Sequence, residues 1–532
     1  MDCTTSYLPY ETTGYFSKIV TDYLHQSDLL KSFYEFAPTL DGVKKAIAAR
    51  KNIYTDKALL VKTLKIQYEG LAISQKVNAN IELLLQENVY TVTTAHQPNI
   101  FTGPLYFIYK IMHAVKLAEE LANSIPEAKF VPIYYMGSED ADINELGFIN
   151  VGTEKLQWET KQTGAVGRMK VDKRFIQIIN LIEGQIGVLP FGNSLVQLFK
   201  SCYTEGKTIQ QATLELVNHL FADYGVVIVI PDCVALKASF IPIFEKELKE
   251  QFSHSIVKKT ANELSVNYKV QAAGRPLNLF YLINDRRERI ELLNSEYHIQ
   301  ALDLVFSEAE ILIELNNNPE RFSPNVILRG LFQETIMPNI AFIGGGGELA
   351  YWMELKNVFN ATSIPYPVLI LRNSFLFINK EQQAKLNKLL IKKENLFFKT
   401  QYLIDNKIKE ISDNQINLAK EIDETIALYN RVELLVDKID VSLVGHIQSL
   451  KTKAIKRLLG VEKKMLRAEK EKFTSISNQI TQLKLSLFPN ESLQERHDNL
   501  SIFYSKYGNE WLSAIYQSSQ GLNQQFGIIS VD

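Results

Sequence analysis

The sequence predicts an α/β protein with a parallel sheet covered by helices, followed by a long helical arm. Between residues 85 and 375, short apolar runs alternate with amphipathic helical patterns, and glycine and proline separate them. Between residues 376 and 488, glycine becomes rare, proline is absent, and Lys, Glu, Gln, Asn, Ile and Leu dominate. The first pattern is typical of a sheet with helices on both faces, and the second is typical of long helices.

Five apolar runs predict buried strands. The helical pattern of 105–121 follows the first of them, with Lys110 on its polar side, and this spacing predicts a βαβ unit. Residues 151–220 interrupt the rhythm and are predicted to form an inserted subdomain, and residues 277–292 predict a hairpin around Asn284-Asp285. The five predicted strands are Val89–Thr94, Phe130–Tyr135, Val226–Ile230, Ile340–Ile343 and Val368–Leu371.

A heptad pattern predicts a coiled coil in the second region. Steps of four and three from Ile455 to Leu487 meet ten positions, of which eight are apolar. The run 381–435 is long enough to be its antiparallel partner, with a turn near 441–445, although the pattern is equally compatible with a partner helix in a second chain. We therefore predict a core over 1–375, an arm over 376–490 and a C-terminal segment, 491–532, that packs back on the core.

Composition excludes several classes of protein. A net charge of −2 over 532 residues argues against an electrostatic nucleic-acid binder. Cys3, Cys202 and Cys233 are far apart and form no C-x-x-C pair, which argues against a disulfide framework and a zinc site. The sequence has no secretory signal, lipidation motif or apolar run long enough to span a bilayer, so we expect a cytoplasmic protein with no membrane partner.

The end of the first predicted strand carries polar residues. Ligands of open α/β sheets bind beyond the carboxyl ends of the strands, where His96 and Gln97 are expected. Thr102 and Gly103 precede a helix start, whose free N–H groups attract phosphate or carboxylate. The alternative is that His96 is an ordinary loop histidine.

The second predicted strand ends in an acidic cluster. Ser138 is followed by Glu139, Asp140 and Asp142, which can bind a cation or a substrate amine or act as a general base. The alternative is capping of the next helix, with acids in its first turn. Spacing alone does not decide between the two.

Two further strand ends are candidates for anion binding. Arg372 and Ser374 follow the last predicted strand, and an arginine there can pair with a phosphate or form a surface ion pair. Glycines at a strand end let a backbone approach a ligand closely, or form a tight turn. We expect Tyr351 and Trp352, in the helix that follows, to contact substrate. The glycines after the fourth strand are Gly344, Gly345, Gly346 and Gly347.

The basic run 451–472 is the remaining charged feature. It carries nine Lys or Arg and three Glu, which could contact RNA or a nucleotide. The usual interpretation of such a run is a solvated helix face.

Several segments, taken together, resemble one family, the bacillithiol biosynthesis cysteine-adding enzymes. The resemblance implies a Rossmann-like core related to class I aminoacyl-tRNA synthetases and nucleotidylyltransferases, with inserted connecting-peptide elements and a coiled-coil arm used for dimerisation. It implies amide formation between cysteine and glucosaminyl-malate. The segments are H-Q-P-N-I-F-T-G-P-L-Y-F-I-Y-K, G-S-E-D-A-D, T-G-A-V-G-R-M, S-P-N-V-I-L-R-G, G-G-G-G-E-L-A-Y-W-M-E-L-K, L-Q-E-R and Y-S-K-Y-G.

The resemblance also implies roles for particular residues. His96 corresponds to the first histidine of the H-I-G-H element, and Arg372 and Ser374 lie roughly where a K-M-S-K-S loop falls. The sequence departs from the related patterns at Asn99, which replaces the second histidine, and at Ala141 and Gly346, where the family often has histidine and proline.

These inferences combine into one functional hypothesis. Amide formation in water needs an activated carboxylate, so we expect ATP with Mg²⁺ as co-substrate and no zinc. His96 and Arg372 are expected to stabilise phosphate charge. Asp140, with Glu139 and Asp142, is expected to bind an ammonium group or act as base. The alternative is an RNA-binding or scaffold protein with an inactive core that works through its arm.

Overall fold

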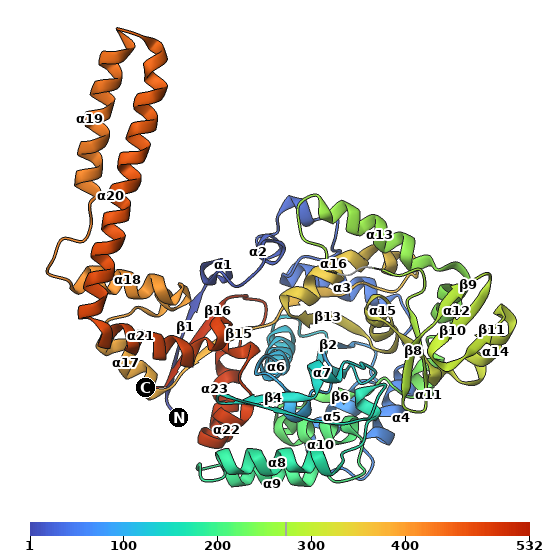
Figure 1. The fold of residues 1–532 in the computed structure, drawn as a ribbon. Helices are drawn as coiled ribbons and strands as arrows, with labels where there is room; N and C mark the ends of the chain where they lie inside the picture. The colour runs from blue at the N-terminus through green and yellow to red at the C-terminus, as the bar shows by residue number, and fades with distance from the viewer. Residues whose placement is uncertain (272–273, 532) are drawn as a thin grey trace. The chain divides into compact units, whose positions relative to one another are not determined.

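The computed structural model describes residues 1–271 and 274–531, which form two compact units (Figure 1). Unit 1 contains Met1–Phe377 and Gln494–Val531, and unit 2 contains Ile378–Leu493. The C-terminal segment therefore belongs to the same unit as the N-terminal sheet. Asp532, the last residue of the predicted segment, lies outside the described residues.

A five-stranded parallel sheet is the centre of unit 1. Its order is β14-β13-β2-β3-β6, so the chain runs outward from β2 on one side and then returns to the other side of β2. This reversal creates a crevice between the carboxyl ends of β2 and β13, where doubly wound sheets bind ligands. The strands are β2 (Val89–His96), β3 (Lys129–Met136), β6 (Val227–Val229), β13 (Asn339–Gly344) and β14 (Val368–Leu371), which confirms all five predicted strands.

Helices cover the sheet because its strands are apolar on both faces. Helix α6 (Tyr106–Ser124) follows β2 as predicted and packs on β2 and β3. Helix α3 (Leu40–Lys51) contributes to the same apolar core as α6 and packs on β13. The resulting Rossmann-like arrangement is the predicted fold class.

The segment between β3 and β6 contains the predicted insertion. It begins with the β4 (Phe148–Val151) and β5 (Glu154–Gln157) hairpin and continues through α8 (Lys173–Ile186) and α9 (Gly192–Cys202). Helix α10 (Ile209–Phe221) also lies in the predicted range, but it packs on β6 and so returns the chain to the sheet.

Smaller strands surround the central sheet. The predicted hairpin is formed by β7 (Leu279–Ile283) and β8 (Arg286–Arg289), with Ile283 opposite Arg286 across the turn. A separate three-stranded sheet has the order β1 (Cys3–Leu8), β16 (Phe526–Val531) and β15 (Ser374–Ile378), and its β1 and β16 are antiparallel. The first and last described strands of the chain are therefore neighbours, with Cys3 paired to Val531.

Unit 2 is helical. Helices α19 (Ala419–Asp437) and α20 (Val444–Lys472) pack along each other, joined by a short turn at Val441–Leu443 that lies in the predicted turn region. The expected single helix over 381–435 is instead three helices, α17 (Lys380–Leu389), α18 (Thr400–Ile411) and α19.

The predicted heptad helix is interrupted at Phe473, which separates α20 from α21 (Thr474–Leu487). Ile480 and Leu487 of α21 are buried, whereas Leu459 of α20 is 43% exposed. Heptad positions near the end of α21 are therefore buried, and at least one heptad position is exposed in α20. Within the described residues, no helix is both long enough and apolar enough to cross a membrane.

Candidate active site

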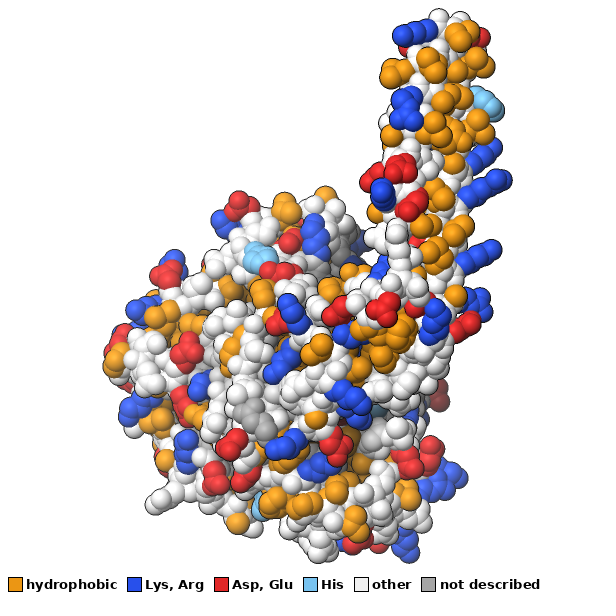
Figure 2. Space-filling view, turned by 90° about the vertical axis from the view of Figure 1, so that its left-hand side faces the viewer, with side chains coloured by type: hydrophobic (Ala, Val, Ile, Leu, Met, Phe, Trp, Pro, Cys, Tyr) orange, Lys and Arg blue, Asp and Glu red, His pale blue; other side chains and the backbone are white. Residues whose placement is uncertain are grey.

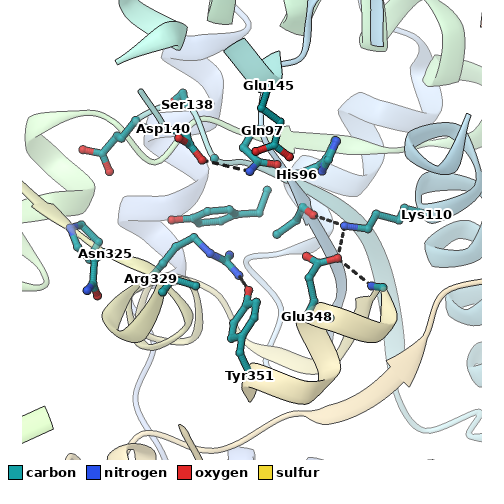
Figure 3. A pocket seen from close by; sticks show the side chains of 18 of the residues that line it. His96, Gln97, Lys110, Ser138, Asp140, Glu145, Asn325, Arg329, Glu348 and Tyr351 are labelled. Carbon is teal, nitrogen blue, oxygen red and sulfur yellow. Dashed lines mark hydrogen bonds and ion pairs between the residues drawn. The ribbon is translucent and has the colours of Figure 1, made fainter. Parts of the chain in front are cut away.

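A cavity of about 610 Å³ lies at the crevice of the central sheet (Figure 3). Its walls come from the loops after β2 and β3, the start of α16 (Gly346–Asn360), and α15 (Val326–Ile336). The size is within the usual range for small-molecule sites. The carboxyl ends of three predicted strands, β2, β3 and β13, therefore lie around one cavity.

His96 lies at the end of β2 and lines this cavity. Its carbonyl accepts a hydrogen bond from the Gly137 N–H at 2.8 Å, while its Nε2 atom is buried without a hydrogen-bond partner. Burial and the positive charges of Lys110 and Arg372 lower the pKa of His96 well below its usual value. The imidazole is therefore neutral and has a nitrogen available to a ligand.

Lys110 connects the two sides of the crevice. Its ammonium donates to the Ala95 carbonyl at 2.9 Å and forms an ion pair with Glu348, whose carboxylate also accepts from the Gly345 N–H at 2.8 Å. Lys110 was predicted on the polar side of its helix, yet its side chain is only 3% exposed. Burial also lowers the pKa of Lys110. The pair ties the end of β2 to the start of α16.

The three clustered carboxylates have separate partners. Glu139 forms a buried ion pair with Lys237, which lies 3.4 Å from Asp232. Asp232 in turn accepts two hydrogen bonds from Arg168, both at 2.6 Å. Burial raises the pKa of Glu139, against the effect of Lys237. Glu139 lines the cavity, but its charge is already paired inside this network.

Asp142 caps a helix and Asp140 lines the cavity, so each takes one of the two roles, capping and ligand binding, that the spacing left open. Asp142 is exposed and caps the short helix α7 (Ile143–Leu146), because its side chain accepts from the Glu145 N–H at 3.1 Å. Asp140 lines the cavity and accepts from the Gln97 side-chain amide at 3.1 Å. Asp140 has no ion-pair partner among the residues that the structure describes, and its carboxylate is therefore available to a cationic ligand.

Ser138 is the remaining polar residue of this loop. Its side chain is fully buried, its Oγ atom has no hydrogen-bond partner, and it lines the cavity. Gly167 packs on it so closely that a Cβ at that position would lie 2.5 Å from the Ser138 carbonyl oxygen. The T-G-A-V-G-R-M segment therefore supports the floor of the cavity.

The glycine run has two roles. Gly344 ends β13 and does not line the cavity, whereas Gly345, Gly346 and Gly347 do. A Cβ on Gly346 would lie 2.9 Å from the Val20 side chain, so this glycine is needed for packing. A Cβ on Gly347 would meet nothing within 4 Å, which leaves the backbone open to a ligand at the helix N-terminus.

Thr102 and Gly103 lie outside the cavity. Phe101, Thr102 and Gly103 have φ values of 49°, 71° and 62°, and the Asn499 amide donates to the carbonyls of Phe101 and Gly103 at 2.9 and 2.6 Å. The Leu105 N–H is bonded to the Asp498 carbonyl at 2.9 Å. The C-terminal segment thus occupies the helix start at which we had expected phosphate.

Arg372 reaches the cavity from a buried position. Its guanidinium forms a 2.7 Å ion pair with Glu495 and donates to the Ser374 hydroxyl at 3.1 Å. Ser374 itself is fully buried and is not part of the cavity wall. The alternative of an exposed surface pair is excluded for Arg372, because its ion pair is buried, and Ser374 is its partner rather than a residue of the cavity wall.

The two aromatic residues predicted to contact substrate point in different directions. Tyr351 lines the cavity and accepts a hydrogen bond from Arg329 at 2.8 Å. Trp352 is fully buried and stacks on Phe342 with ring centroids 4.4 Å apart. Neighbouring residues of a helix lie about 100° apart around its axis, and the structure places Trp352 in the core.

Comparison with known proteins shows the family. The model for "Bacillithiol biosynthesis BshC, N-terminal Rossmann-like domain" matches residues 1–373, and that for the "C-terminal coiled-coil domain" matches residues 375–531. The chain belongs to the BshC family.

The relatives are similar over their whole length. A protein of Flavobacterium johnsoniae is 38% identical over 99% of this chain and 100% of its own, and one of Flavobacterium psychrophilum is 39% identical over 99% of both. Both bear the name "Putative cysteine ligase BshC". A solved structure described as a "putative arginyl t-RNA synthetase" from Campylobacter jejuni covers 84% of this chain and 99% of its own at 11% identity, but its TM-score of 0.21 is too low to bear on the fold.

Four arginines of the cavity were missed by sequence reasoning: Arg275, Arg287, Arg329 and Arg496. Among the described residues, none of the four has a carboxylate within ion-pair distance. Arg287 instead donates to the Ser323 hydroxyl at 3.1 and 3.2 Å. Two could have been noticed, since Arg329 ends the S-P-N-V-I-L-R-G segment before its glycine and Arg496 ends L-Q-E-R.

Arg329 and Asp140 lie on different walls of the BshC cavity. Figure 3 shows Asp140 and Gln97 on the side of the β2 and β3 loops, and Arg329 and Tyr351 on the side of α15 and α16. Arginines with only neutral partners can bind phosphate or carboxylate in a bidentate manner. Among the described residues, no cluster of three or more His, Cys, Asp or Glu is placed to hold a metal ion.

Proposed function

We propose that this chain is a ligase that joins the carboxyl group of cysteine to the amine of glucosaminyl-malate, the last step of bacillithiol formation. The family description and the name carried by its relatives support a cysteine ligase in this pathway. The observation that carries the proposal is one cavity that contains four arginines without carboxylate partners, and in which Arg329 and the carboxylate of Asp140 lie on different walls.

We propose ATP, as its Mg²⁺ complex, as the activating co-substrate. A carboxylate oxygen of cysteine attacks a phosphorus atom of ATP, which releases either ADP or pyrophosphate and leaves an acyl-phosphate or acyl-adenylate. The glucosamine nitrogen then attacks the carbonyl carbon, phosphate or AMP leaves, and the nitrogen loses a proton. Negative charge develops on phosphate or carbonyl oxygens in both steps. Fixed hydrogen-bond donors in a site shielded from water stabilise such charge best.

The residues of the cavity fit these demands. The four unpaired arginines can hold the phosphates of ATP and the two carboxylates of the malate group. Asp140 can hold an ammonium group, and the neutral His96 can accept a hydrogen bond or proton at Nε2. The open N-terminus of α16 at Gly347 offers N–H groups to a phosphate.

The alternative of a scaffold or RNA-binding protein is less well supported. A scaffold has no need for buried, unpartnered polar atoms at a cavity, and His96 and Ser138 each keep one there. In the basic run of α20, Lys451, Lys470 and Lys472 are engaged in ion pairs within the unit.

A direct assay tests the proposed function. Purified protein is incubated with Mg-ATP, cysteine and glucosaminyl-malate, and mass spectrometry follows the amide product. Phosphorus NMR of the same mixture identifies the nucleotide product as ADP or AMP, and thus the activated intermediate. Absence of amide, with all three substrates present and the protein folded, contradicts the proposal.

We propose that the arm of unit 2 joins two copies of the chain in the cytoplasm. The far end of α19 and the following turn carry exposed apolar side chains, including Leu434, Leu435, Ile439 and Val441 at 62–81% exposure. Figure 2 shows apolar side chains along the arm, interspersed with Lys and Arg. A monomer rarely leaves such a cluster exposed, and a second copy of the same surface would cover it.

A further inference from the structure

Arg329 is held at the cavity wall by two neutral partners. Its guanidinium donates to the Tyr351 hydroxyl at 2.8 Å and to the Gln333 side-chain oxygen at 3.2 Å. Gln333 lies one helical turn farther along α15, is fully buried and does not line the cavity. One of the two groups that orient Arg329 is therefore behind the wall.

Glu334 determines which end of the Gln333 amide faces Arg329. The Gln333 amide nitrogen donates to the Glu334 carboxylate at 2.9 Å, which leaves the amide oxygen for the guanidinium. The same carboxylate oxygen accepts from the Asn339 amide at 2.7 Å, and Glu334 is 1% exposed. Because Glu334 accepts a hydrogen bond from the Gln333 amide nitrogen, the Gln333 amide oxygen stays directed at Arg329.

Arg50 anchors the end of this chain of contacts. Its buried guanidinium donates to the backbone carbonyls of Glu334 and Met337, at the C-terminal end of α15. Asn339 begins β13, and its side-chain oxygen accepts from the Thr91 hydroxyl of β2 at 3.2 Å. The contacts thus run from the central sheet through a carboxylate and an amide to a cavity arginine.

We propose that Gln333 and Glu334 are positioning residues that hold Arg329 in the orientation that binds an anionic substrate. The inference rests on the proposed function only in that Mg-ATP and glucosaminyl-malate are the anions offered to Arg329. An arginine whose fork is pre-oriented loses less side-chain entropy when it binds a phosphate or carboxylate. Loss of the relay therefore weakens binding without removing a group that touches the substrate.

The test uses the full chain and measures binding directly. Calorimetry gives the Kd of Mg-ATP and of glucosaminyl-malate separately for Gln333→Met, which keeps the length but removes the acceptor. We expect at least one Kd to rise about tenfold, the effect of losing one orienting hydrogen bond to a charged group. The rate at saturating substrate should change by less than about threefold, since the reacting atoms are untouched.

Two matched variants separate positioning from general destabilisation. Glu334→Gln keeps an acceptor for Gln333 and should bind both anions at least as tightly as the wild type, whereas Glu334→Leu should weaken the same anion as Gln333→Met. Asn218→Leu removes a buried amide in α10 that donates to the Ala72 carbonyl at 2.8 Å, far along the chain from the relay. It should lower stability and leave both Kd values unchanged.

The outcomes distinguish this inference from the proposed function. Wild-type affinity for both anions in folded Gln333→Met overturns the relay even if the wild-type enzyme forms the amide. An equal loss of affinity in Asn218→Leu also overturns it. If Gln333→Met does not fold, Gln333→Glu replaces it, because a carboxylate there pairs with Arg329 and must weaken anion binding by at least the same factor. Failure of amide formation in the wild type contradicts the function and leaves these binding results unaffected.

Discussion

The guanidinium of Arg372 and the carboxylate of Glu495 form a 2.7 Å ion pair in which the side chains are 4% and 0% exposed. Glu495 also accepts from the Ser374 hydroxyl at 3.2 Å and from the Phe375 N–H at 3.3 Å. The pair links the turn after β14 to the C-terminal segment, 123 residues later in the chain. A cavity arginine thus depends on the last part of the sequence for its charge balance.

Glu495→Gln should destabilise unit 1. Removal of one partner from a buried pair leaves the other charge uncompensated, which typically costs about 3 to 5 kcal/mol. Denaturant titration measures this change in the free energy of unfolding. The control is Glu510→Gln, whose carboxylate pairs with the N-terminal amine on the surface and should matter little. Equal stability of the two variants would contradict the importance of the buried pair.

Asp140→Asn should weaken the binding of an amino substrate by about 2 kcal/mol, the value of one hydrogen bond to a charged group. Calorimetry with cysteine and with glucosaminyl-malate measures it, and Mg-ATP affinity should remain unchanged. Asp142→Asn is the matched control, because that neighbouring carboxylate caps α7 outside the cavity. If Asp142→Asn weakens amine binding as much as Asp140→Asn, the assignment of Asp140 fails.

Glu334 should make stability fall as pH rises from about 4.5 to 7. Burial raises the pKa of this carboxyl to about 7, although Arg50 and Asn339 oppose the shift. An unfolded glutamate titrates near pH 4.3, so in this window the folded chain holds a proton that the unfolded chain has released. The free energy of unfolding falls by about 3 kcal/mol across this window, and the fall is complete above the pKa of the folded chain.

The variant Glu334→Gln isolates this contribution. The free energy of unfolding of this variant should not fall with pH through this residue. The variant should therefore become more stable relative to the wild type as pH rises from 5 to 7.5. Urea denaturation at both pH values measures the two free energies of unfolding. A difference that stays constant with pH would show that Glu334 does not titrate in this window.

The arm should determine the oligomeric state. Replacing Leu435 and Ile439 with Asp places charges in the exposed apolar cluster and should lower the mass seen in light scattering toward that of one chain. Val188→Asp is the control, since Val188 is 96% exposed in unit 1 and its replacement should leave the mass unchanged. A dimer that persists in the double variant rules out this surface as the contact.

Local pattern was sufficient to predict the elements of the core. The five strands followed from apolar runs such as Val89–Thr94, because a strand covered on both faces must be apolar throughout. The same periodic reasoning failed for Lys110, which lies on the polar side of its helix yet is buried. The polar side of α6 faces the cavity at that point, and a helical wheel does not distinguish a cavity from solvent.

The partners of the site residues could not be predicted from the sequence. Lys237 pairs with Glu139 from 98 residues away in the sequence. The Asn499 side-chain amide donates to the loop around Thr102 from nearly 400 residues away. Such contacts depend on the tertiary fold, and a single sequence carries no pattern that pairs them. The four unpaired arginines share this difficulty, because being unpaired is a property of the folded surroundings.

The path of the chain through unit 1 has a consequence for its synthesis. Phe377 and Gln494 are joined by hydrogen bonds of 2.9 and 3.2 Å, so all of unit 2 is encoded between two neighbouring positions of unit 1. A ribosome therefore completes unit 2 while unit 1 still lacks Glu495, Asn499 and the strand β16. Because domains fold as units when their residues have emerged, the arm can fold first, while the small sheet still lacks β16, the strand that lies between β1 and β15, until the end of the chain is made.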